Sequence, residues 1–95
     1  MKNGRTYTMG LCKDRHRFPV HEGIFPHHVE VKEAGTLERY ANERIPEDCD
    51  TLEVYVSGLT VAMLAVVKVC AARGIHLVAY HWNERYRLYT KQTVL

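Results

Sequence analysis

The chain has 95 residues, 46% hydrophobic and 25% charged, and this composition is typical of a single folded domain spanning residues 1–95, not of a disordered or fibrous chain. Thirteen basic residues against eleven acidic ones give a formal net charge of +2, a balance too even to indicate nucleic-acid binding by charge alone. Three cysteines without a Cys-x-x-Cys pair indicate a reducing compartment. The first ten residues lack the apolar segment of a secretion signal, and the longest apolar run is too short for a membrane span, so we expect a cytoplasmic protein.

Residues 6–12 are predicted to form the first strand, and an irregular loop is predicted to follow over residues 13–31. Pro19, Gly23 and Pro26 interrupt this second segment. The loop holds four of the six histidines, but their spacing matches no zinc module. We therefore expect neither a metal nor a cofactor. The four histidines are His16, His21, His27 and His28.

Residues 36–45 show the pattern of a short amphipathic helix. Thr36 is the expected N-cap, and Leu37, Ala41 and Ile45 recur at helical spacing. Pro46 is expected to end the helix, because proline restricts the residue before it to extended conformations.

Residues 52–82 have the pattern of a strand, a helix and a second strand. Apolar Leu52, Val54 and Val56 alternate with other residues, which is strand periodicity. Thr60 can cap the start of a helix and Gly74 can end it. The β-branched and aromatic run 75–82 reads as the next strand. A unit of about this length closes with a right-handed crossover and a parallel strand pair.

The last predicted elements are a turn at Asn83 and Glu84 and a strand over residues 86–92. A turn this short pairs the last strand antiparallel to the one before it. The expected fold is therefore α/β and Rossmann-like, with the order β-loop-α-β-α-β-β and a small, mainly parallel sheet that ends in an antiparallel C-terminal edge strand.

The helix expected after Thr60 is almost uniformly apolar. Between Val61 and Ala72 only Lys68 is polar, whereas a helix that covers one sheet face normally shows a polar stripe. A second copy of the chain would cover the other side, which predicts a homo-oligomer, a dimer or larger. The alternative is that the 13–31 loop folds over this helix.

Ligands of open α/β sheets bind beyond the carboxyl ends of the parallel strands. A helix start there offers amides to a phosphate, arginines offer counter-charges and tryptophan offers a stacking surface for a base. The turn before Thr60 is neither a P-loop nor a Gly-x-Gly-x-x-Gly motif, and it is also what an ordinary strand-to-helix turn looks like. The candidate ligand-binding residues are Ser57, Gly58, Leu59, Thr60, Arg15, Arg17, Trp82 and Arg85.

Aromatic and cationic residues are interleaved between Tyr80 and Tyr89. Such a pattern can bind single-stranded nucleic acid. It is equally typical of an edge hairpin, in which charged residues prevent edge-to-edge association. We favour the hairpin, so nucleic acid is not an expected partner.

The segment Tyr55–Ala62 contains Tyr-Val-Ser-Gly-Leu-Thr and is followed by Cys70, Gly74-Ile75 and His81. This pattern resembles that of a group of small bacteriophage and prophage proteins. The likeness includes Arg15-His16 and Ile24-Phe25-Pro26. More remotely, residues 52–82 are similar to the nucleotide pocket of CRISPR-associated Rossmann-like domains, which dimerise and bind cyclic oligonucleotides. Together these resemblances imply a phage-type protein in the cytoplasm of a bacterial host, acting on a nucleotide signal of bacterial immunity.

Three functions are compatible with these residues. The first is a nucleotide-binding protein that sequesters a cyclic or phosphate-bearing nucleotide. The second is a metal-independent cyclic-nucleotide phosphodiesterase, with His81 or His16 as acid and base and with Ser57 and Thr60 orienting phosphate. The third is an inhibitor that binds a host protein through the apolar helix or the sheet edge. Whether the protein is an enzyme therefore stays open at this point.

Overall fold

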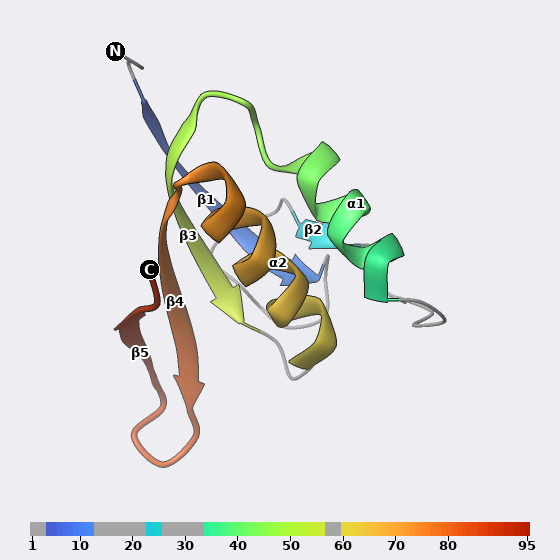
Figure 1. Ribbon diagram of the computed structural model, residues 1–95. Coiled ribbons are helices and arrows are strands. Elements are labelled where there is room, and N and C mark those ends of the chain that lie inside the picture. The colour runs from blue at the N-terminus through green and yellow to red at the C-terminus, as the bar shows by residue number, and fades with distance from the viewer. Residues whose placement is uncertain (1–3, 13–22, 26–33, 57–59) are drawn as a thin grey trace.

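A computed structural model describes residues 4–12, 23–25, 34–56 and 60–95 of the chain. The predicted irregular loop contains one strand, β2, that the sequence analysis did not anticipate, because three residues are too few to show a periodicity. The elements, shown in Figure 1, are β1 (Arg5–Cys12), β2 (Gly23–Phe25), α1 (Ala34–Arg44), β3 (Cys49–Val56), α2 (Thr60–Arg73), β4 (His76–Asn83) and β5 (Leu88–Thr93).

The strands form one five-stranded sheet in the order β2-β1-β3-β4-β5. The pairs β1–β2, β1–β3 and β3–β4 are parallel, and only β4–β5 is antiparallel. The prediction of an α/β domain with a mainly parallel sheet and an antiparallel C-terminal edge strand is confirmed. Its Rossmann-like character stays a prediction.

Both helices pack on the same face of the sheet, where Figure 1 shows α2 lying over the central strands and α1 beside it towards β2. The core lies between the helices and this face, which we call the helix-covered face. Alternate strand residues supply its sheet side, because successive side chains of a strand point to opposite faces. The sheet contributes Leu11, Leu52, Val54, Leu77 and Ala79, the helices contribute Leu37, Ala41, Ala62, Val66 and Cys70, and Ile45 follows directly after α1, all buried.

Helix α1 begins at Ala34, so the prediction of Thr36 as its N-cap is wrong. Thr36 lies two residues inside the helix, where its hydroxyl cannot replace the cap residue that precedes the first turn. The predicted apolar side is confirmed, since Leu37, Ala41 and Ile45 are all buried.

Helix α2 ends where Gly74 predicts, and it begins at Thr60 itself, which was expected to cap the helix from the position before it. At its C-terminus the amide of Ile75 donates to the Cys70 carbonyl at 2.9 Å, and the amide of Gly74 donates to the Ala71 carbonyl at 3.4 Å. Gly74 has φ +67°, which a residue without a Cβ adopts without steric cost. This is the Schellman arrangement that satisfies the last carbonyls of a helix.

Arg73, the last residue of α2, forms hydrogen bonds with the backbone that follows α1. Its guanidinium donates to the carbonyl of Ile45 at 3.1 Å and also to the carbonyl of Pro46. Both carbonyls lie directly after α1, where no further helical amide is available to donate to them. The sequence pattern gives no sign of this contact, because its partners are backbone atoms 27 and 28 residues away.

We expect Arg73→Ala to lower the free energy of unfolding by about 2 kcal/mol, because half-buried carbonyls lose a charged donor. Arg73→Lys should recover part of this loss, since lysine keeps the charge but not the fork of donors. Urea denaturation of the three proteins measures the difference. Equal midpoints for the wild type and Arg73→Ala would show that the contact contributes nothing.

The C-terminal hairpin pairs as predicted but turns later than predicted. The turn occupies residues 84–87 and β5 begins at Leu88, two residues after the predicted start at Tyr86. The side chain of Asn83 accepts a hydrogen bond from the Tyr86 amide at 3.2 Å, and Arg87 takes a left-handed conformation with φ +53°. These two residues extend the turn before the ladder resumes.

No helix in the described ranges has the length and apolarity to cross a membrane.

Candidate functional site

Four aromatic residues share the sheet face that neither helix covers. Tyr55 of β3 lies opposite Tyr80 of β4, and Trp82 of β4 lies opposite Tyr89 of β5. Because Leu77 and Ala79 of β4 point to the helix-covered face, Tyr80 and Trp82 point to the other one. We call these four residues the aromatic face.

The rings of the aromatic face contact one another. Tyr55 and Tyr80 are stacked, with centroids 4.9 Å apart and planes 15° apart. The rings of Tyr89 and Tyr55 pack edge to face, with centroids 4.8 Å apart. The centroids of Tyr89 and Trp82 are 5.2 Å apart, and their planes are inclined by 66°. Such separations are those of favourable aromatic pairs. The result is one continuous aromatic surface across three neighbouring strands.

Trp82 is the most exposed member, with 47% of its surface accessible, whereas the three tyrosines are half-buried. The β3–β4 ladder ends at the pair Val56 and His81, so Trp82 lies beyond it and pairs only with β5 within the described residues. The indole Nε1 donates to Glu84 Oε2 at 2.6 Å, which holds the ring in one orientation. An exposed, oriented indole is well suited to stack with a planar ligand.

Glu53 lies next to this surface on the same face. Its Oε1 accepts a hydrogen bond from the Thr8 hydroxyl at 2.9 Å, and its Oε2 accepts one from the Tyr80 hydroxyl at 3.0 Å. The hydrogen bond to Glu53 raises the pKa of Tyr80, since it favours the protonated phenol. Partial burial raises the pKa of Tyr89. The hydrogen bond from Tyr7 to Asp48, at 2.7 Å, raises the pKa of Tyr7 in the same way.

These raised tyrosine pKa values predict a loss of stability in alkali. The ordinary tyrosine pKa is 10.0, and a higher value in the folded state means that the unfolded chain releases the proton first. The stabilisation is therefore complete below pH 10 and falls as the pH rises through the folded-state pKa values. We expect Tyr80→Phe to weaken this dependence of the unfolding free energy on pH. Urea denaturation at a series of alkaline pH values tests it, and identical slopes for the two proteins would refute it.

Three basic residues lie on the hairpin that carries Trp82 and Tyr89. Lys91 is opposite Tyr80 on the same face, and Arg85 lies over the ring of Tyr86 at 5.6 Å in the turn. Arg87 completes the group, and all three are exposed. None of the three forms an ion pair with another residue of the described ranges. Their charges are therefore accessible to an anion.

The predicted site residues are divided by the sheet. His81 is opposite Val56, so it lies on the helix-covered face, where its Nε2 is 2.8 Å from Gln92 Oε1. Thr60 is exposed at the first position of α2, on the same side as His81. Trp82 points the other way, so Thr60 and Trp82 do not share one face. The predicted residues Arg15, His16, Arg17, Ser57, Gly58 and Leu59 lie outside the described residues.

The candidate ligand-binding residues did not include Tyr55, Tyr80 and Tyr89 of the aromatic face, or Glu53 beside it. The signal was present in the sequence, because residues two apart in a strand share a face. Tyr80 and Trp82 therefore had to lie together, as did Glu53 and Tyr55. Which residues of different strands are neighbours depends on the register, and the sequence does not contain that directly.

Two other kinds of site receive no support from the described residues. No group of three or more His, Cys, Asp and Glu side chains in them could hold a metal ion, and the histidine-rich segment lies outside them. Burial raises the pKa of the Cys70 thiol to about 11 and raises that of Cys49 as well. Both thiols therefore stay protonated near neutral pH and are poor nucleophiles.

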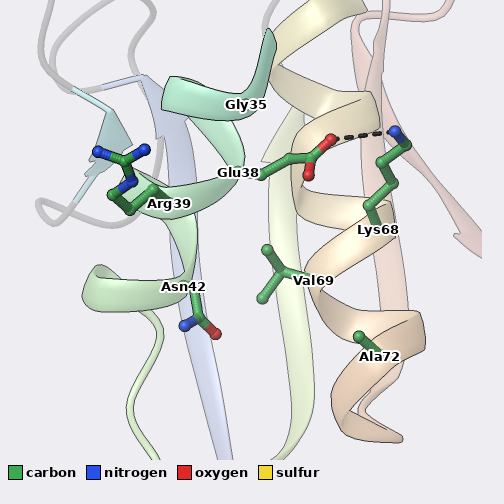
Figure 2. Close-up of a pocket in the computed structure, with 7 residues that line it drawn as sticks. All are labelled: Gly35, Glu38, Arg39, Asn42, Lys68, Val69 and Ala72. Atoms are coloured by element: carbon green, nitrogen blue, oxygen red, sulfur yellow. Dashed lines mark ion pairs between the residues drawn. The ribbon is translucent and has the colours of Figure 1, made fainter.

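A groove of about 370 Å³ lies between α1 and α2, as Figure 2 shows. Lys68 Nζ and Glu38 Oε1 are 3.0 Å apart across it. Since these two charged groups neutralise each other, the pair offers little to a charged ligand. The lining residues are Gly35, Glu38, Arg39, Asn42, Lys68, Val69 and Ala72.

No protein-family model, curated protein or solved structure matches the chain. The geometry of the aromatic face and the charges near it are therefore the observations that bear on function. The resemblance to phage proteins stays a prediction.

Proposed function

We propose that the protein binds nucleotides, with the nucleobase stacked on the aromatic face. The observation that supports this proposal is a continuous surface of four rings on the sheet face without helices, ending in the oriented and exposed Trp82. Every nucleobase has a π-face, and stacking on an aromatic side chain contributes about 1–3 kcal/mol per base.

The charges around the aromatic face suit the rest of a nucleotide. Lys91 lies beside Tyr80, and Arg85 and Arg87 lie in the turn beyond Trp82. A phosphate attached to a base on Trp82 would be within reach of these flexible cations. An uncharged aromatic ligand would leave them unused, and this favours a phosphate-bearing one.

A purely structural role explains the tyrosines better than it explains the tryptophan. Contacts among Tyr55, Tyr80 and Tyr89 stabilise the sheet by about 0.5–1.5 kcal/mol per pair. Trp82 lies past the end of the β3 ladder with nearly half its surface in water. Its exposed area adds little to stability, so binding is the better account of it.

Of the two histidines predicted as acid and base, only His81 lies within the described residues, and its position favours binding over cleavage. Acid–base catalysis needs a histidine close to the reacting phosphate. His81 points to the helix-covered face and contacts Gln92, whereas Trp82 stacks on the opposite face. The phosphodiesterase, the inhibitor and the role in bacterial immunity stay predictions.

The test is to incubate the pure protein with cyclic and linear nucleotides, remove the free ligand, and analyse what denaturation releases. Release of intact nucleotide supports sequestration. Release of an altered nucleotide supports the phosphodiesterase. A protein that retains and alters none of them would contradict the proposal.

We also propose that the outer side of α2 is an interface between copies of the chain. Leu64 and Val61 are 57% and 38% exposed there, on a helix whose inner side is already buried in the core. Burying such side chains in a two-fold contact removes apolar surface from water.

Light scattering coupled to gel filtration should therefore give at least twice the chain mass of 11.0 kDa. Leu64→Asp should reduce it to that of one chain, because a carboxylate would be buried at the contact. A wild-type protein that runs as a monomer at micromolar concentration would refute the proposal.

A further inference from the structure

We propose that the aromatic face binds a single-stranded nucleic acid of several nucleotides, which makes the ligand a polynucleotide. This inference rests on the proposed function and names the ligand class of the same site. It departs from the expectation drawn from the sequence, because the strand register that brings Tyr55 and Tyr89 beside Tyr80 and Trp82 is not contained in the sequence directly.

The aromatic surface is larger than one nucleobase. Tyr80 and Trp82 are two residues apart on β4, which separates them by about 6–7 Å along the strand. Beyond Trp82 the turn presents Tyr86, which is 64% exposed. A single base covers only part of a surface that begins at Tyr55 and continues through Trp82. The remaining aromatic area is available to neighbouring bases of the same chain.

Positive charge is concentrated in the C-terminal hairpin. Between Asn83 and Thr93 the hairpin carries Arg85, Arg87 and Lys91 against a single carboxylate, Glu84. This segment alone therefore holds a net charge of +2, equal to the formal net charge of all 95 residues. The carboxylate of Glu84 accepts a hydrogen bond from the Trp82 indole, and that of Glu53, beside the aromatic face, accepts hydrogen bonds from Thr8 and Tyr80. Cations interleaved with aromatic side chains match the alternation of phosphate and base in a single strand.

Stacking on the aromatic face requires bases with an accessible ring face. In a duplex the bases are stacked on one another and present only their edges in the grooves. An aromatic surface can stack only with bases that are free on one face, which single strands provide. The phosphates of a duplex could contact the basic side chains, but its bases could not stack on the aromatic rings.

The experiment measures fluorescence anisotropy of labelled thymidine monophosphate, of single strands of about four and about eight thymidines, and of a duplex of the longer strand. We expect affinity to rise at least tenfold from the mononucleotide to the longer strand. The duplex should bind at least tenfold more weakly than that strand. Affinity should fall with added salt, because phosphate contacts release counterions.

Two variants separate the contributions. Arg85→Gln with Lys91→Gln should flatten the salt dependence of oligonucleotide binding, since each lost phosphate contact lowers the slope by about one. The matched control is Lys68→Gln on α2, which removes a cation paired with Glu38 on the helix side of the sheet. That control should bind like the wild type.

The outcomes distinguish this inference from the proposed function. Mononucleotide binding that does not improve with length would overturn the inference and leave the proposed function in place. Equal affinity for duplex and single strand would also overturn it, because stacking would then play no part. Absence of binding by the mononucleotide and by every strand would overturn both.

Discussion

Replacing Val66 by aspartate is expected to unfold the domain. Val66 is 0% exposed and belongs to the core cluster between α2 and the sheet. A carboxylate there would lose its hydration, or would have to be protonated, at a cost of several kcal/mol. The total stability of a domain of this size is about 5–10 kcal/mol, so one such change removes most of it.

The matched control is Leu64→Asp, two residues earlier on the same helix. Leu64 is 57% exposed, so its aspartate stays hydrated in a single chain. Far-ultraviolet circular dichroism and solubility of the two proteins measure the difference. We expect a folded Leu64→Asp protein and an unfolded or insoluble Val66→Asp protein. A cooperatively folded Val66→Asp protein would mean that α2 does not pack as described.

The largest expected effect on binding comes from Trp82→Ala. Removing the indole takes away the exposed stacking surface, which lowers nucleotide affinity by about 1–3 kcal/mol, or roughly five- to more than a hundredfold. Trp82→Phe keeps an aromatic ring without the Nε1 donor that contacts Glu84. It should therefore retain much of the affinity. Calorimetric titration of the three proteins with one nucleotide gives the comparison.

Trp82→Ala should also remain folded, because nearly half of the side chain is in water already. We expect its unfolding free energy to fall by about 1 kcal/mol through loss of the contact with Tyr89. Thermal melting provides this control. Wild-type nucleotide affinity in a folded Trp82→Ala protein would place the ligand elsewhere on the molecule.

Local patterns predicted the elements that carry their own signals. The alternation at Leu52, Val54 and Val56 predicted a strand with one buried face, and those first two side chains are fully buried. Gly74 predicted the end of α2 because only a residue without a Cβ takes its conformation easily. The order of the strands was out of reach, because the position of β1 between β2 and β3 depends on contacts between distant segments.

The candidate site was harder to predict than the fold. Reasoning from strand ends grouped Thr60, His81 and Trp82, since all follow or end parallel strands. The alternation of side chains along β4 separates His81 from Trp82, because the two are consecutive and point to opposite faces. The same alternation puts Trp82 and Tyr80 on one face. The register then adds Tyr55 from β3 and Tyr89 from β5, which no local pattern connects.

The most direct test of nucleotide binding is the fluorescence of Trp82 itself. It is the only tryptophan in the chain, so its emission reports this one position. Stacking of a base on the indole changes that emission, whereas ribose phosphate, which has no base, should leave it unchanged. We predict a saturable change when a nucleotide is added to the wild-type protein. Emission that stays constant with every nucleotide tested, up to millimolar concentration, would contradict binding at the aromatic face.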